Sequence, residues 1–221
     1  MNGMFFHIYN RGNNGEKIFF EERNYNYFLK KFSKYLLDFI DVYCNCLLPE
    51  HFHLIIRIKD IDNFNSELFR IPDDFCKQLS PVEKAFKDFF ISYAKSINKA
   101  YERTGSLFQC KYKRNLISNE DELRRLIAYI HTNPIRRGYC SNIEDWNFSS
   151  YNFIIHLYKV SKIYTEVVDL FGGLDSFEKF HMDYMDHQRE SDLLFKDYYK
   201  STIPRLSKYI TNYSLFFQLK K

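Results

Sequence analysis

Residues 49–56 have the sequence PEHFHLII, in which His51 and His53 stand on either side of one phenylalanine. Residues two apart in a β-strand project to the same side of the sheet, so both imidazoles would leave one face together. The run from Leu47 to Ile56 is almost continuously apolar, as expected of a strand buried on both faces. Histidines in such a strand are costly without partners, and one shared metal ion would satisfy both.

An ordinary interpretation competes with the metal site, because His-x-His is a short motif. The two rings could be core histidines whose nitrogens bond backbone carbonyls. The rest of the chain has to separate these alternatives.

The composition indicates one main folded domain plus an extension. The chain has 221 residues, 19% aromatic side chains, and only seven Gly and five Pro, which leaves little linker. Its five cysteines fit neither a zinc pattern nor a disulfide framework, so reduced structural thiols are expected. Neither a signal peptide nor an apolar segment of about 18 residues is evident. These features predict a soluble, cytoplasmic protein without a membrane segment.

The charge distribution is uneven, although the formal net charge is only +4. Residues 103–137 contain eight basic side chains and three acidic ones. Such a basic stretch indicates a surface that faces a polyanion, with a solvated helix face as the alternative.

The first part of the chain predicts half of a ferredoxin-like unit. Residues 4–10 are aromatic and β-prone, and they lead into turn-forming residues. Apolar positions three and four apart predict an amphipathic helix over residues 24–39. Residues 40–48 and 51–58 then predict two strands of a hairpin around Pro49. Strand, helix, strand, strand is the order of that fold.

The second part predicts two further helices. One starts near Pro81 and continues toward Tyr101. Another opens at a capping box of Ser118 with Asp121, and Pro134 limits its length. The predicted class is α+β: a ferredoxin-like (RRM-like) antiparallel sheet with helices on one face, plus a mainly helical C-terminal extension. The predicted domains are residues 1–151 and 152–221.

The last of these helices places two polar side chains on one edge. Its core face would be formed by Leu123, Leu126, Ile127 and Ile130. A rotation of about 100° per residue then puts Tyr129 at the border of that face, with Asn133 one turn later. A boundary tyrosine beside a C-cap asparagine is the simpler alternative.

Several motifs in order resemble the single-tyrosine HUH nucleases, specifically the REP-associated tyrosine transposases and related insertion-sequence transposases. The resemblance covers roughly residues 4–151. The motifs that carry it are Asn10-Arg11-Gly12, Leu48-Pro49-Glu50-His51-Phe52-His53, the basic and aromatic run at 105–113, Tyr129-Ile130-His131-Thr132-Asn133-Pro134, and Asp145-Trp146-Asn147-Phe148-Ser149-Ser150-Tyr151.

The resemblance implies that His51 and His53 bind a divalent metal, with Asn133 as a further ligand and Tyr129 as the nucleophile. It also implies cleavage of single-stranded DNA at hairpin-flanked sites by a homodimer. Nucleoid association in the cytoplasm is expected of such a protein. The family often has tryptophan at the position of Phe108 and glycine at that of Cys110, which puts substrate contacts in doubt more than chemistry.

The chemistry of these residue types agrees with that role. Free tyrosine has a pKa of about 10, so it attacks a phosphodiester poorly without an activated phosphate. A metal held by two imidazoles and a carboxamide would polarise the phosphate and keep positions open for it. Mixed imidazole and carboxamide ligands suit Mn²⁺ or similar ions, whereas abundance in the cell favours Mg²⁺, and the sequence does not choose between them. We expect Arg11, Lys111 and Arg114 to contact DNA.

Two other functions fit the same residues. The chain could be a catalytically idle module that binds single-stranded nucleic acid on the same fold. It could also be a structural zinc protein in which Cys44 and Cys46 join the histidines. Only the enzyme requires the two histidines, Tyr129 and Asn133 to converge.

Overall fold

The computed structural model describes residues 4–59, 79–109 and 111–187. The contacts divide the chain into two compact units, residues 1–177 and 178–221. The fold below is that of the first unit. The predicted boundary after Tyr151 falls inside this unit, at the start of a helix.

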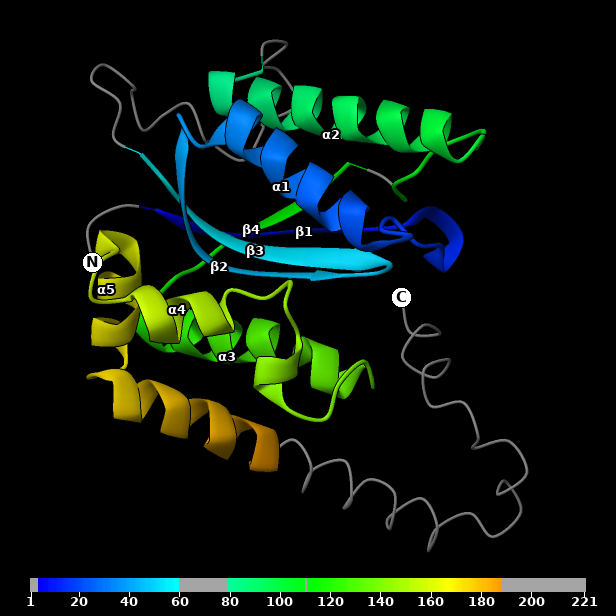
Figure 1. The fold of residues 1–221 in the computed structure, drawn as a ribbon. Coiled ribbons are helices and arrows are strands. Elements are labelled where there is room, and N and C mark those ends of the chain that lie inside the picture. The colour runs from blue at the N-terminus through cyan, green and yellow to red at the C-terminus, as the bar shows by residue number, and fades with distance from the viewer. Residues whose placement is uncertain (1–3, 60–78, 110, 188–221) are drawn as a thin grey trace, which may run out of the picture. The chain divides into compact units, whose positions relative to one another are not determined.

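Four strands form a single antiparallel sheet in the order β2-β3-β1-β4 (Figure 1). The strands are β1 (Phe5–Arg11), β2 (Ile40–Leu48), β3 (His51–Ile58) and β4 (Lys113–Leu116). The hairpin predicted from the sequence is confirmed with the same bounds. This strand order is that of the ferredoxin-like fold, so the predicted α+β class is confirmed.

Two helices cover one face of the sheet (Figure 1), namely α1 (Glu22–Leu36) and α2 (Pro81–Ala100). Phe52, Leu54 and Ile56 of β3 point to this side and join the core beneath these helices. Pro81 occupies the first turn of α2, and Ser80 caps the helix in a reciprocal pair of bonds with Glu83. The proline and capping pattern explains where α2 starts.

Three further helices lie on the opposite face (Figure 1): α3 (Glu120–Arg136), α4 (Tyr151–Leu157) and α5 (Lys162–Leu170). The sequence predicted helices on one face, and the structure adds this second layer. The physical reason is that Ile55 of β3, with Cys44 and Cys46 of β2, makes this face apolar as well. Leu123, Ile127 and Ile130 of α3 bury it, as their spacing predicted.

The ends of α3 differ in detail from the prediction. The N-cap is Asn119, whose side chain accepts a bond from the Glu122 amide at 2.9 Å, and not Ser118. Ser118 donates its own amide to the Glu122 carboxylate, so the capping residues are shifted by one position. Pro134 lies inside the last turn, and the helix ends two residues later.

A glycine links the end of β1 to the turn before the histidines. The amide of Gly12 donates to the Glu50 carbonyl at 2.7 Å. A Cβ at Gly12 would lie 1.8 Å from the carbonyl oxygen of Glu16, the residue that follows the short 3-10 helix η1 (Asn13–Gly15). Only glycine allows this close approach, which accounts for the Asn-Arg-Gly motif.

Candidate active site

His51 and His53 project from the same face of β3, as the spacing predicted. Their side chains are buried, at 7% and 8% exposure, and their ring centroids are 5.2 Å apart. This is the face that α3 partly covers. The central position of β3 between β2 and β1 holds both residues in a fixed register.

Tyr129 of α3 lies beside this pair. Its ring meets that of His53 edge to face, with centroids 5.6 Å apart. The guanidinium carbon of Arg136 lies 4.9 Å from the centroid of the Tyr129 ring. A cation at that distance is attracted to the electron-rich face of an aromatic ring. The sheet and the helix therefore bring the predicted nucleophile to the histidines.

Asn133 lies one turn after Tyr129 and is buried, with 2% exposure. Its Nδ2 atom has no hydrogen-bond partner, and neither has Nε2 of His51. The oxygen and nitrogen ends of a carboxamide are similar in size, so a half turn of this side chain would present its oxygen to a ligand. Buried polar atoms without partners are rare and costly. A divalent cation bound by these groups would satisfy them, so the residues present fit a metal.

His7 of β1 is a site residue that the sequence reasoning missed. Its Nε2 lies 2.9 Å from Nδ1 of His53, and the two rings stack with centroids 5.1 Å apart. Burial lowers the pKa of His7 to about 4. Burial, and then the positive charges of His51, His7 and two arginines, lower the pKa of His53 well below its ordinary value. Both rings are therefore neutral at pH 7.

Glu50 contacts Nδ1 of His51, as His7 contacts Nδ1 of His53. Its Oε1 lies 3.2 Å from Nδ1 of His51, and its Oε2 accepts a bond from the Tyr139 hydroxyl at 2.6 Å. Burial acts to raise the pKa of Glu50, but the bonds from His51 and Tyr139 outweigh it and lower the pKa to about 2. Burial and the bond to Glu50 raise the pKa of Tyr139. Glu50 is thus a carboxylate at neutral pH.

The predicted DNA contacts lie in different places. Arg11 ends β1 on the histidine side and donates to the Gln109 side chain. Arg114 pairs opposite Ile8, on the other face of the sheet, where it contacts Glu83 at 2.5 Å. Lys111 is exposed just before β4. The structure thus brings Arg11, but not Arg114, to the face that carries the histidines.

A basic residue that the sequence reasoning passed over does share that face. Lys113 pairs with Tyr9 across β1 and β4, and its Nζ lies 5.9 Å from the Tyr9 ring centroid. Tyr9 in turn stacks on His7 at 4.8 Å. Alternation along β4 could have selected Lys113 over Arg114, but only once the pairing register was known.

The zinc alternative finds no support in the part of the chain that the structure describes. No group of three or more His, Cys, Asp and Glu side chains there could hold a metal ion. Cys44 instead lies 3.3 Å from Nε2 of His131, which also contacts the Ser150 hydroxyl. Cys44 and Cys46 are free, buried cysteines of the core, as expected for thiols with a structural role.

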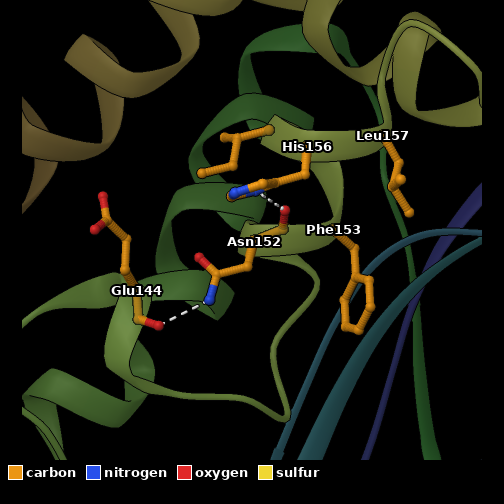
Figure 2. A pocket seen from close by; sticks show the side chains of 6 residues that line it. Glu144, Asn152, Phe153, His156 and Leu157 are labelled. Carbon is orange, nitrogen blue, oxygen red and sulfur yellow. Dashed lines mark hydrogen bonds between the residues drawn. The ribbon is translucent and has the colours of Figure 1, made fainter.

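A pocket lies away from these residues, beside α4 and the 3-10 helix η3 (Ile143–Asp145) (Figure 2). Asn152 donates to the Glu144 carbonyl at 2.7 Å, and Nδ1 of His156 donates to the Asn152 carbonyl at 2.8 Å. Phe153 and Leu157 supply its apolar lining. None of its lining residues belongs to the predicted site.

Comparison with known proteins shows which proteins this chain resembles. No family model matches the chain. A provisionally named REP-associated tyrosine transposase of Haemophilus influenzae is 26% identical over 108 residues, which cover 48% of this chain and 56% of that protein. A REP-associated tyrosine transposase of Escherichia coli K12 is 24% identical over 106 residues, covering 48% of this chain and 51% of its own.

The fold agrees with the sequence similarity. A solved REP-associated tyrosine transposase bound to a REP hairpin matches with a TM-score of 0.50 and 17% identity, over 70% of this chain and 79% of its own. These findings confirm the resemblance to the REP-associated tyrosine transposases. The chain spans about half the length of the curated relatives it matches. Within the described residues, no helix has both the length and the apolarity to cross a bilayer.

Proposed function

We propose that this protein is a metal-dependent, single-strand-specific DNA endonuclease and strand transferase of the tyrosine HUH type. The observation that carries the proposal is the contact between the Tyr129 and His53 rings. It is supported by the buried atoms His51 Nε2 and Asn133 Nδ2, which have no hydrogen-bond partners. A module that only binds nucleic acid has no need for this convergence. The relatives' names support a transposase role.

His51, His53 and Asn133 would hold Mg²⁺ or Mn²⁺. When bound, such a cation polarises a phosphodiester oxygen and stabilises the charge that develops in the transition state. Two imidazoles and one carboxamide leave coordination positions for phosphate and water. The neutral state of His53 suits this role, because only an unprotonated nitrogen can bind a cation.

Tyr129 would make the covalent bond. Its Oη attacks phosphorus and forms the Oη–P bond, while the bond from phosphorus to the 3′-oxygen breaks. The phenol proton is lost and the 3′-oxygen leaves with a proton as a free hydroxyl. The product is a 5′-phosphotyrosine, and attack by another 3′-hydroxyl reverses the step and joins strands. Arg136, whose guanidinium lies over the phenol ring, would hold that ring in place by a cation–π contact.

The substrate would be single-stranded DNA beside a hairpin. The solved relative is bound to a REP hairpin, and this chain has Arg11, Tyr9 and Lys113 on the histidine face of the sheet. Basic groups neutralise phosphates and an aromatic ring stacks on unpaired bases. Action as a homodimer on nucleoid DNA completes the proposal.

The proposal is tested with hairpin-containing oligonucleotides labelled at either end, in Mn²⁺ or Mg²⁺. A 3′-labelled strand should give a covalent protein–DNA band under denaturing conditions, whereas a 5′-labelled strand should give only a free shorter product. Tyr129→Phe should abolish the band and keep DNA binding within a few-fold. Tyr27→Phe, on α1 at the other face, is the matched control and should leave the band unchanged. A band that survives in Tyr129→Phe refutes this nucleophile.

A further inference from the structure

Both candidate metal-binding imidazoles have Nδ1 engaged by a neighbour. Nδ1 of His51 lies 3.2 Å from Glu50 Oε1, and Nδ1 of His53 lies 2.9 Å from His7 Nε2. The neighbours come from different elements, the β2–β3 turn and the middle of β1. A ligand shared by the two imidazoles must therefore bind to their Nε2 atoms.

The hydrogen-bond partners restrict the tautomer of each ring. Glu50 Oε1 lies 3.2 Å from Nδ1 of His51, and a hydrogen bond between these two atoms places the proton on Nδ1. An imidazole that binds a cation through Nε2 has its lone pair on that atom and its proton on Nδ1. Nε2 of His51 is buried without a hydrogen-bond partner.

For His53 the partner is another ring, so one of the two facing nitrogens donates and the other accepts. A lone pair on Nε2 of His53 requires that Nδ1 donates to His7. Stacking adds to this bond, since the His7 ring lies 26° from the plane of His53 and 28° from that of Tyr9. The bond and the stack together hold the His53 ring in one orientation.

We propose that His7 and Glu50 are positioning residues that keep His53 and His51 in the Nδ1–H form, with both Nε2 atoms free for one divalent cation. This inference rests on the proposed function. His7 acts through His53, because its Nε2 faces Nδ1 of that ring and not the Nε2 that is left for the cation. The Tyr139 hydroxyl donates to Glu50 at 2.6 Å and so helps to keep the Glu50 carboxyl group beside His51. Such outer partners typically change metal affinity by about 10- to 100-fold.

The first test is the tautomer itself, read from ¹⁵N chemical shifts of the imidazoles in the metal-free protein near pH 7.5. We expect both His51 and His53 to show a protonated Nδ1 and a bare Nε2. A protonated Nε2 on either ring overturns the inference for that ring. This measurement uses the wild-type chain, so it does not depend on a variant that folds.

The second test is Mn²⁺ binding by calorimetry, with folding checked by urea unfolding. His7→Phe keeps an aromatic ring but removes the acceptor, and should weaken Mn²⁺ binding by about 10- to 100-fold. His7→Gln restores an acceptor near the position of Nε2 and should return affinity to within a few-fold. His156→Phe, at an exposed histidine on α4, is the matched control and should have no effect.

The outcomes separate this inference from the proposed function. Wild-type affinity in His7→Phe, with binding lost in His51→Ala, overturns the role of His7 and leaves the proposed function intact. A wild-type protein that binds neither Mn²⁺ nor Mg²⁺ overturns the metal role of His7 and Glu50 together with the proposed metal-dependent reaction. Equal weakening by His7→Phe and His7→Gln would show a packing effect and also overturn the inference.

Discussion

The ring of Tyr129 approaches that of His53 edge to face, with an angle of 80° between the ring planes. One residue comes from a central strand and the other from a helix that follows all four strands in sequence. The contact exists because α3 packs its apolar stripe on β2 and β3 and leaves its tyrosine edge over the histidines. The burial of β3 therefore fixes where the histidines lie, and the burial of α3 fixes where Tyr129 lies.

Arg136 should tune the nucleophile without being essential for the covalent step. We expect Arg136→Gln to slow formation of the DNA adduct by roughly 10-fold, because a cation near an aromatic ring is worth about 0.5–2 kcal/mol. The measurement is a single-turnover time course at saturating DNA. Arg125→Gln, at an exposed position of the same helix, is the control. An equal effect of both variants would indicate a general loss of positive charge rather than an action on Tyr129.

Lys113 should contribute more to DNA binding than Arg114. Lys113 lies on the histidine face beside Tyr9, whereas Arg114 faces α2 and pairs with Glu83. We expect Lys113→Gln to weaken binding of single-stranded DNA and to lower the slope of log affinity against log salt by about 1. Titrations at several salt concentrations measure both quantities. A larger change in Arg114→Gln would place the DNA on the opposite face and support the sequence-based prediction for that residue.

Glu83 should make the free energy of unfolding depend on pH in the acidic range. Burial acts to raise the pKa of Glu83, but bonds from Ser80 and Arg114 outweigh it and lower the pKa. A lowered pKa in the folded state stabilises the fold above the unfolded pKa, and that stabilisation is lost as pH falls through the folded value. Gln can keep the capping bond at this position but loses the ion pair with Arg114, so Glu83→Gln should be less stable at pH 7 by about 0.5–1 kcal/mol. The difference should shrink below about pH 4. A pH-independent difference in urea unfolding would contradict the ionic explanation.

The sequence predicted the candidate ligands and the nucleophile because local periodicity places them. The residues that hold them in position are placed by contacts between distant segments, which periodicity does not show. Strand alternation alone puts His51 and His53 on one side, and helical periodicity alone puts Tyr129 and Asn133 on one edge. His7 could not be found in this way, since its role depends on the β1–β3 register, which pairs Tyr9 with His53. Tyr139 was also out of reach, because its contact with Glu50 depends on the turn after α3.

The second layer of helices escaped prediction for a related reason. A near-continuous apolar run signals burial on both faces, but it does not say which segment covers each face. Only the folded structure shows that α3 to α5 provide the second cover, with Tyr43 of β2 and Arg57 of β3 both bonded to Glu166 of α5.

Asn133 is the weakest of the three proposed ligands on chemical grounds, and its substitution gives the clearest test of the set. Asn133→Leu has a similar volume but no oxygen, so it should lower Mn²⁺ affinity by about 10-fold or more while the fold stays intact. Asn133→Asp keeps an oxygen in the same place and adds a negative charge, so its Mn²⁺ affinity should equal or exceed that of the wild type. Calorimetric titration of both variants measures this order. If the leucine variant binds Mn²⁺ as well as the wild type does, then the Asn133 carboxamide, whose Nδ2 has no partner, serves another purpose, and the cation is held by the two histidines, water and phosphate alone.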